Sequence, residues 1–204
     1  VHSILDGLRE HKEIQIYEPV LTEYRRWTKE HPFDRGNGWG TEPWCQEEMP
    51  VTKELAEQAA AKSDIAVVII GRTAGEDKDN SAAEGSYLLT AAEHQMLKEV
   101  CGAFKRVAVL LNVGNIMDMK WVKEYDPAAV LYVWQGGQEG GAGEEPDVVQ
   151  DMRCEPEQGP ERGSGGRPRP GGAGPPRGGR GDAVGGQSRC RGVGQAGVHT
   201  VEGA

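Results

Sequence analysis

Carboxylates gather in one short loop of this 204-residue chain. The loop holds Glu76, Asp77 and Asp79 within four residues. Two cationic side chains, Arg72 and Lys78, lie beside them. Charged and polar side chains can form hydrogen bonds with the several hydroxyl groups of a sugar, and nearby glycines let a ligand approach the backbone closely. The loop therefore predicts a hydroxyl-binding site, although a solvated acidic turn that caps the next segment fits the same residues.

Short apolar runs rich in β-branched residues predict strands that are buried on both faces of a parallel sheet. These runs span 64–71, 106–112 and 129–134. Helical patterns precede and separate them, over 51–62, from Thr90 to Phe104 and over 116–125. Thr90 and Glu93 have the spacing of a capping box. Helices that alternate with strands imply right-handed crossovers and an α/β sandwich.

Three loops are expected to meet at one edge of this sheet. They cover 72–80, 113–115 and 135–141, and each follows a predicted strand. Because the carboxyl ends of parallel strands share an edge, and ligands of open α/β sheets bind there, this edge is the predicted site.

Residues 1–50 are expected to pack on the domain as a helix followed by an irregular, tryptophan-rich loop. Val20, Leu21, Tyr24 and Trp27 have the spacing of one helical face. The loop over 31–40 leaves two interpretations open: an aromatic platform for a ligand, or a segment held in place by buried indoles.

Several other kinds of site are not supported by the sequence. The widely spaced Cys45, Cys101, Cys154 and Cys190 argue against a zinc site or a disulfide framework. No glycine-rich phosphate motif follows a strand, and no nucleophile elbow surrounds a serine, so neither a cofactor nor serine hydrolysis is expected.

The net charge of −9 argues against nucleic acid as a partner, and the lack of a long apolar stretch argues against a membrane span. No signal peptide is visible, which predicts a cytoplasmic location. The chain opens on Val1 rather than Met, so we expect it to be part of a longer protein.

The composition changes sharply near residue 136. All 12 aromatic residues lie before that point, whereas 21 of the 30 glycines lie at or after it. A segment with so little to bury is expected to be disordered. The abundance of Gly, Arg and Pro without Lys over 142–204 also suggests a frameshifted reading frame, with an Arg-rich RNA-binding tail as the alternative.

Together the three loops carry a family resemblance. The runs Gly75-Glu76-Asp77-Lys78-Asp79, Leu110–Gly114 and Trp134–Gly141 resemble, in order and spacing, the second domain of glycoside hydrolase family 3, the β-glucosidase family. The resemblance covers about residues 3–141. It implies a flavodoxin-like parallel-sheet sandwich packed against a TIM-like barrel, with a β-linked glucoside or oligosaccharide bound between them. Residues 51–141 would be a partial copy of this domain.

The resemblance also implies roles for particular residues. Family members are retaining glycosidases, in which a barrel aspartate attacks the sugar and a second carboxyl protonates the leaving group. Glu76 is the candidate for that acid/base, although in many members this residue lies further downstream. Arg72, Asp77 and Asp79 are expected to bind substrate hydroxyls, and Arg72, Glu76 and Asp79 also to brace the loop.

The departures from the family pattern limit what this chain is expected to do. A barrel takes roughly 250 residues, and nothing before Val51 could supply it, so the nucleophile should be absent and the chain inactive alone. Without the usual continuation after Gly141, the strand over 129–134 should lie at an unprotected sheet edge and leave the chain marginally stable. A non-catalytic carbohydrate-binding or interaction module remains the alternative.

Overall fold

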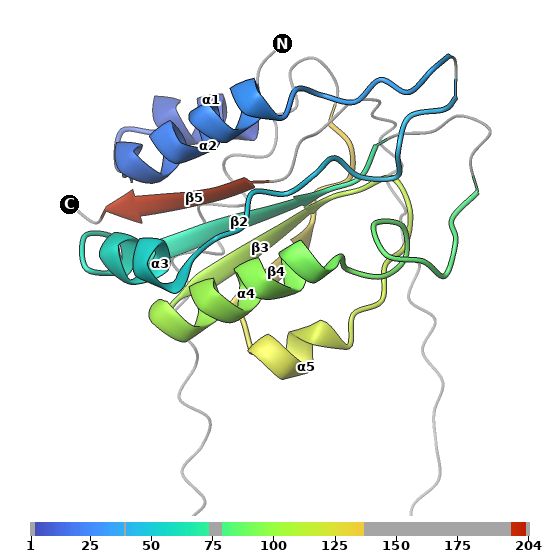
Figure 1. Ribbon diagram of the computed structural model, residues 1–204. Coiled ribbons are helices and arrows are strands. Elements are labelled where there is room, and N and C mark those ends of the chain that lie inside the picture. Colours follow the sequence, from blue (N-terminus) through green and yellow to red (C-terminus); the bar gives the residue numbers. More distant parts are fainter. Residues whose placement is uncertain (1–2, 39, 74–78, 137–196, 203–204) are drawn as a thin grey trace, which may run out of the picture. The chain divides into compact units, whose positions relative to one another are not determined.

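A five-stranded sheet organises the described part of the chain, residues 3–38, 40–73, 79–136 and 197–202 of this computed structural model (Figure 1). Its strands are β1 (Gln15–Ile16), β2 (Ile65–Gly71), β3 (Val107–Asn112), β4 (Ala129–Tyr132) and β5 (Gly197–Glu202). The order across the sheet is β1-β5-β2-β3-β4. β2, β3 and β4 run parallel, whereas β5 is antiparallel to both of its neighbours. The predicted α/β architecture is confirmed.

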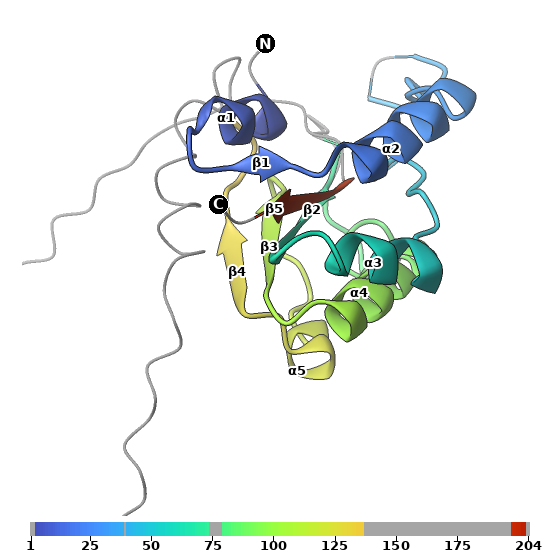
Figure 2. The ribbon, with the colours of Figure 1, turned by 90° about the vertical axis from the view of Figure 1, so that its left-hand side faces the viewer.

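Helices cover both faces of the sheet. They are α1 (Ile4–Glu10), α2 (Glu18–Glu30), α3 (Lys53–Ala60), α4 (Ala91–Ala103) and α5 (Trp121–Tyr125). α1 lies over one face, and α2, α3, α4 and α5 lie over the other (Figure 2). No helix among the described residues is long and apolar enough to cross a membrane.

The central strand β2 is buried on both sides, as its uninterrupted apolar run predicts. Ala66, Val68 and Ile70 belong to the larger core beneath the four helices. Val67 and Ile69 point the other way, into a smaller cluster that includes Leu8 of α1. This alternation follows from the two-residue period of a strand. It fixes the register, because a slip by one residue would exchange the two cores.

Local capping signals set where the helices begin. The predicted capping box is present: Glu93 N donates to Thr90 Oγ1 at 3.1 Å, and Thr90 N donates to Glu93 Oε2 at 2.8 Å. A second capping box, between Ser3 and Asp6, begins α1. Neither α1 nor β1 was anticipated from the sequence, and both are short.

Three predicted elements are shorter than expected, and one of them, the helix predicted over 51–62, spans Lys53–Ala60. Residues 116–120 form a loop rather than the first turns of a helix. There the main-chain groups bond side chains from elsewhere, with Met117 N donating to the Tyr132 hydroxyl at 2.8 Å. The last strand ends at Tyr132 instead of residue 134, since Trp134 has a φ of 58° that does not fit an extended strand.

Residues 197–202 correct the expectation of a tail that is disordered throughout. They form β5, which pairs along β2 from Ile65 to Ile69 and also pairs with β1. An edge strand presents unpaired main-chain groups, so an extended segment can join it by backbone hydrogen bonds. The expected position of β4 at the end of the strand order is confirmed.

Candidate functional site

The carboxyl edge of the sheet brings together the three loops that the sequence singled out. Gln135, after β4, donates from Nε2 to the main-chain oxygen of Arg72, after β2, at 3.0 Å. A methyl group at Gly114, after β3, would lie 2.9 Å from Gln135 Oε1, so the glycine leaves room for this amide. The described parts of the three loops therefore meet at this edge, as expected.

Arg72 lies at the centre of this edge, and its side chain is almost fully enclosed, with 5% of the residue exposed. Nη1 and Nη2 donate to the two carboxylate oxygens of Glu93 at 2.5 and 3.0 Å. The remaining donors bond the main-chain oxygens of Gly71, Ser86 and Leu88. A guanidinium has five N–H groups, and these contacts use all of them.

The contacts of Arg72 show that its role is structural. The guanidinium joins the end of β2 to the N-terminal turn of α4, through Glu93, and to the loop that carries Ser86 and Leu88. To bind a substrate hydroxyl, Arg72 would have to give up one of these bonds. Hydroxyl binding by Arg72 stays a prediction that its observed contacts do not favour.

Asn80 ties two of the edge loops together, a role that the sequence analysis missed. Its Nδ2 donates to the main-chain oxygen of Ile116 at 2.8 Å. Its Oδ1 accepts from Ser86 Oγ at 2.6 Å and from Ser81 N at 3.2 Å. The sequence around Asn80 gives only a weak indication of this role, because the fold decides which distant residue an Asn in a loop contacts.

The carboxylates of the predicted site fall partly outside the described residues. Glu76 and Asp77 lie there, so their geometry is not part of this structure. Asp79 is described and exposed, next to Asn80. No group of three or more His, Cys, Asp or Glu within the described residues could hold a metal ion.

Aromatic side chains flank the same edge. The rings of Tyr132 and Trp134 are 5.2 Å apart and tilted against each other. The Tyr132 hydroxyl donates to the main-chain oxygen of Asn115 at 3.3 Å, which anchors the loop after β3. Trp134 is 51% exposed. The sequence motif pointed to this tryptophan but not to its left-handed backbone.

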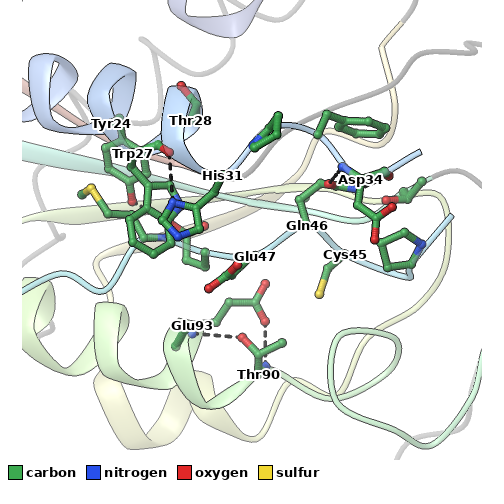
Figure 3. Close-up of a pocket in the computed structure, with 18 of the residues that line it drawn as sticks. Tyr24, Trp27, Thr28, His31, Asp34, Cys45, Gln46, Glu47, Thr90 and Glu93 are labelled. Carbon is green, nitrogen blue, oxygen red and sulfur yellow. Dashed lines mark hydrogen bonds between the residues drawn. The ribbon is translucent and has the colours of Figure 1, made fainter. Parts of the chain in front are cut away.

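A cavity of about 650 Å³ lies beside the edge, between α2, the N-terminal end of α4 and the loop over 31–49 (Figure 3). Gly71 and Thr73 form the part of its wall nearest the edge. Thr73 N donates to the main-chain oxygen of Trp44 at 2.8 Å, which ties the long loop to the sheet. Part of the loop over 31–40 lines it, but the sequence analysis predicted no cavity formed with α2 and α4.

One wall of the cavity is aromatic. The rings of Trp27 and His31 stack, with centroids 3.5 Å apart. His31 Nδ1 lies 3.1 Å from the main-chain oxygen of Trp27. Because a carbonyl oxygen can only accept, the proton of a neutral ring lies on Nδ1, and Nε2 remains able to accept. The Nε1 of Trp27 is buried and has no hydrogen-bond partner within the described residues. Trp27 and Trp44 are half-buried, and Trp39 lies outside the described residues.

Two buried carboxyl groups line this cavity: Glu48, with 8% of the residue exposed, and Glu93, with 2%. Burial raises the pKa of Glu48 to about 7, and the nearby carboxylate of Glu93 also raises it. Hydrogen bonds to Glu48 Oε1 from the Tyr24 hydroxyl, at 2.8 Å, and from Met49 N, at 3.0 Å, act in the opposite direction. Burial likewise raises the pKa of the neighbouring Cys45 thiol.

Comparison with known proteins places this architecture in a family. Residues 1–145 match the model of the glycosyl hydrolase family 3 C-terminal domain. The chain belongs to glycosyl hydrolase family 3. The family resemblance seen in the three edge loops is thereby confirmed.

Relatives of this family 3 domain include a β-glucosidase of Ruminococcus albus, 53% identical over 143 residues, and β-glucosidase A of Butyrivibrio fibrisolvens, 28% identical over 165 residues. These alignments cover 70% and 69% of this chain but only 15% and 19% of the two relatives. The chain therefore spans less than a fifth of the length of either relative.

Solved structures of β-glucosidases share the fold. A β-glucosidase from Paenibacillus barengoltzii is 50% identical with a TM-score of 0.68, over 71% of this chain and 16% of that one. β-Glucosidase 3B from Thermotoga neapolitana, in complex with α-D-glucose, is 25% identical with a TM-score of 0.62, over 74% of this chain and 22% of that one.

Proposed function

We propose that this chain is part of a retaining, β-glucosidase-like glycoside hydrolase and forms one wall of its sugar cleft. The observation that carries the proposal is the bond from Gln135 to Arg72, which joins the motif loops at the carboxyl edge of the sheet. Ligands of open α/β sheets bind at this edge. The family match over residues 1–145 supplies the class of reaction.

The partner of this edge would be the barrel domain of the parent enzyme. Ile116, Met119 and Trp134 are the exposed large apolar residues of the described chain, at 69%, 36% and 51%. All three lie in the segments that follow β3 and β4, at the carboxyl edge. Apolar side chains gathered at one edge support contact with another protein surface.

The retaining mechanism determines which catalytic groups this chain and the barrel would each supply. Such hydrolysis needs two carboxyl groups about 5 Å apart, on opposite sides of the glycosidic bond. We assign the acid/base role to Glu76 and contacts with the hydroxyls of a β-linked glucoside or oligosaccharide to Asp77 and Asp79. Arg72 would brace the loop that carries them by fixing its first residue to α4 and to the segment with Ser86 and Leu88. The nucleophile would come from the barrel, so this chain would not turn over substrate by itself.

A non-catalytic carbohydrate-binding module is the second candidate. The observation that favours it is the cavity of about 650 Å³ beside the sheet edge, which has the stacked rings of Trp27 and His31 in its wall. Such a module would bind a sugar without help from another domain.

Complementation separates the two candidates. The remainder of the R. albus β-glucosidase, made without its counterpart of residues 1–145, would be mixed with this chain, and hydrolysis of an aryl β-glucoside measured. The cleft proposal expects activity in the mixture but in neither part alone, with Trp134→Ala weakening the complementation. Lys105→Ala, an exposed change just before β3 at the opposite end of the strand, is the matched control. Tight binding of glucose or an iminosugar without the added part would favour the module instead.

A further inference from the structure

The cavity beside the sheet edge has an unbalanced set of charges. Five acidic residues line it: Glu30, Asp34, Glu47, Glu48 and Glu93. No lysine or arginine is among the described residues that line it. Glu93 is already compensated by its ion pair with Arg72, which lies outside the cavity wall. The remaining carboxylates give the space a negative potential, which low-dielectric walls strengthen.

One carboxylate oxygen of Glu48 in this cavity has no hydrogen-bond donor among the described residues. Both of its hydrogen bonds within the described residues, from Tyr24 and Met49, go to Oε1. Its Oε2 receives none from those residues, although the residue is more than nine-tenths buried. Buried carboxylates are normally paired with a cation or with hydrogen-bond donors.

The carboxylates are the charged acceptors of the cavity, and the Trp27 Nε1 is a buried donor without a partner among the described residues. Figure 3 shows Glu47 and Glu93 beside the same space, near the stacked rings of Trp27 and His31, with the Glu93 carboxylate held by Thr90 N. His31 Nε2 adds an acceptor, because its partner nitrogen Nδ1 faces the main-chain oxygen of Trp27. An ammonium group carries three donors and no acceptor, which complements this arrangement.

We propose that the cavity formed by α2, α4 and the loop over 31–49 binds a primary ammonium group, paired with Glu48 and Glu47. A metal ion fits less well, since no cluster of three ligating side chains is present in the described residues. The ammonium could belong to a free amine or to a lysine side chain of another protein segment. This proposal is independent of the glycosidase proposal, so each can fail alone.

The cavity should bind ammonium more weakly in acid. Glu48 becomes protonated as the pH falls through its raised pKa of about 7, whereas an alkylammonium stays charged. The groups that face Glu48 are the Tyr24 hydroxyl on α2, the Glu93 carboxylate on α4 with its Arg72 partner, and the Cys45 thiol. Glu47 and His31 line the same space.

Calorimetric titration of the full chain tests the proposal. n-Butylammonium chloride would represent a free amine, Nα-acetyl-lysine methylamide a lysine side chain, and 1-butanol the neutral control. We expect both ammonium probes to bind at pH 8, with butanol at least about tenfold weaker. A stronger response to one of the two probes would assign the source of the ammonium.

Glu48→Gln keeps the acceptor for Tyr24 and Met49 but removes the charge. It should weaken ammonium binding at least about tenfold and abolish its pH dependence. Glu54→Gln, an exposed change on α3, should alter neither. Should Glu48→Gln fail to fold, Glu47→Gln changes an exposed residue of the same cavity and should also weaken binding. Equal binding of butanol, unchanged binding in both cavity variants, or no binding of either ammonium probe would overturn the proposal.

Discussion

Replacing Arg72 with Met is the sharpest test of how the sheet edge is held. The change would leave the Glu93 carboxylate, 2% exposed, with no cation beside it. It would also remove the donors to the carbonyl groups of Ser86 and Leu88. Breaking one side of a buried ion pair costs about 3–5 kcal/mol, a large share of the roughly 5–15 kcal/mol that stabilises a typical domain. The midpoint of thermal unfolding should fall by roughly 10–15 °C.

The assay is urea unfolding at pH 7, followed by far-ultraviolet circular dichroism, with a double-mutant cycle. Arg72→Met/Glu93→Leu removes both charges, so its loss of stability should be smaller than the sum of the two single losses by about 1–3 kcal/mol. Arg72→Lys keeps the charge but not the forked donor geometry, and should fall between wild type and Arg72→Met. The reasoning is refuted if Arg72→Met costs less than about 1 kcal/mol, or if the single losses simply add.

Two further predictions concern the cavity and the loop beside it. Because the pKa of Glu48 is raised from 4.5 to about 7, the folded state favours its protonated form, so the contribution of Glu48 to stability is fully present below pH 4.5 and is lost as the pH rises through 7. Glu48→Gln should therefore flatten the dependence of the unfolding free energy on pH, and at pH 8 it should be more stable than wild type by up to about 3 kcal/mol. Urea unfolding of both proteins across pH 5–8 measures this difference. Equally steep pH dependence in the two proteins would contradict the prediction. Gly85→Ala should cost about 2–4 kcal/mol, because Gly85 has a φ of +74° and the new Cβ would lie 2.6 Å from Cys45 Sγ. Thermal melts should show partial recovery in Gly85→Ala/Cys45→Ala, and a fully stable Gly85→Ala would contradict the geometry.

Local patterns were enough to predict the parallel part of the sheet. The β-branched runs that became β2 and β3 are apolar on both faces, and such runs fit a strand covered on both sides. The Thr90 capping box lies within four residues, so the sequence alone specified where α4 begins. The meeting of the loops at the carboxyl edge followed from strand direction.

Long-range contacts could not be predicted in the same way. The capping-box residue Glu93 also pairs with Arg72, 21 positions earlier, and no local period signals such a pair. β5 pairs along β2 from Ile65 to Ile69, and no local pattern signals that a segment more than 120 residues further along the chain joins this edge. The cavity forms where α2, the N-terminal end of α4 and the loop over 31–49 come together, whereas the spacing of Val20, Leu21, Tyr24 and Trp27 predicts only a helical face.

The central claim is that this chain supplies one wall of a glycosidase cleft and lacks the nucleophile. The most direct measurement is the hydrolysis of an aryl β-glucoside by the purified chain without any added domain. The account predicts a rate equal to that of buffer. Sustained turnover by the chain alone, lost on a carboxylate substitution such as Glu76→Gln, would contradict it.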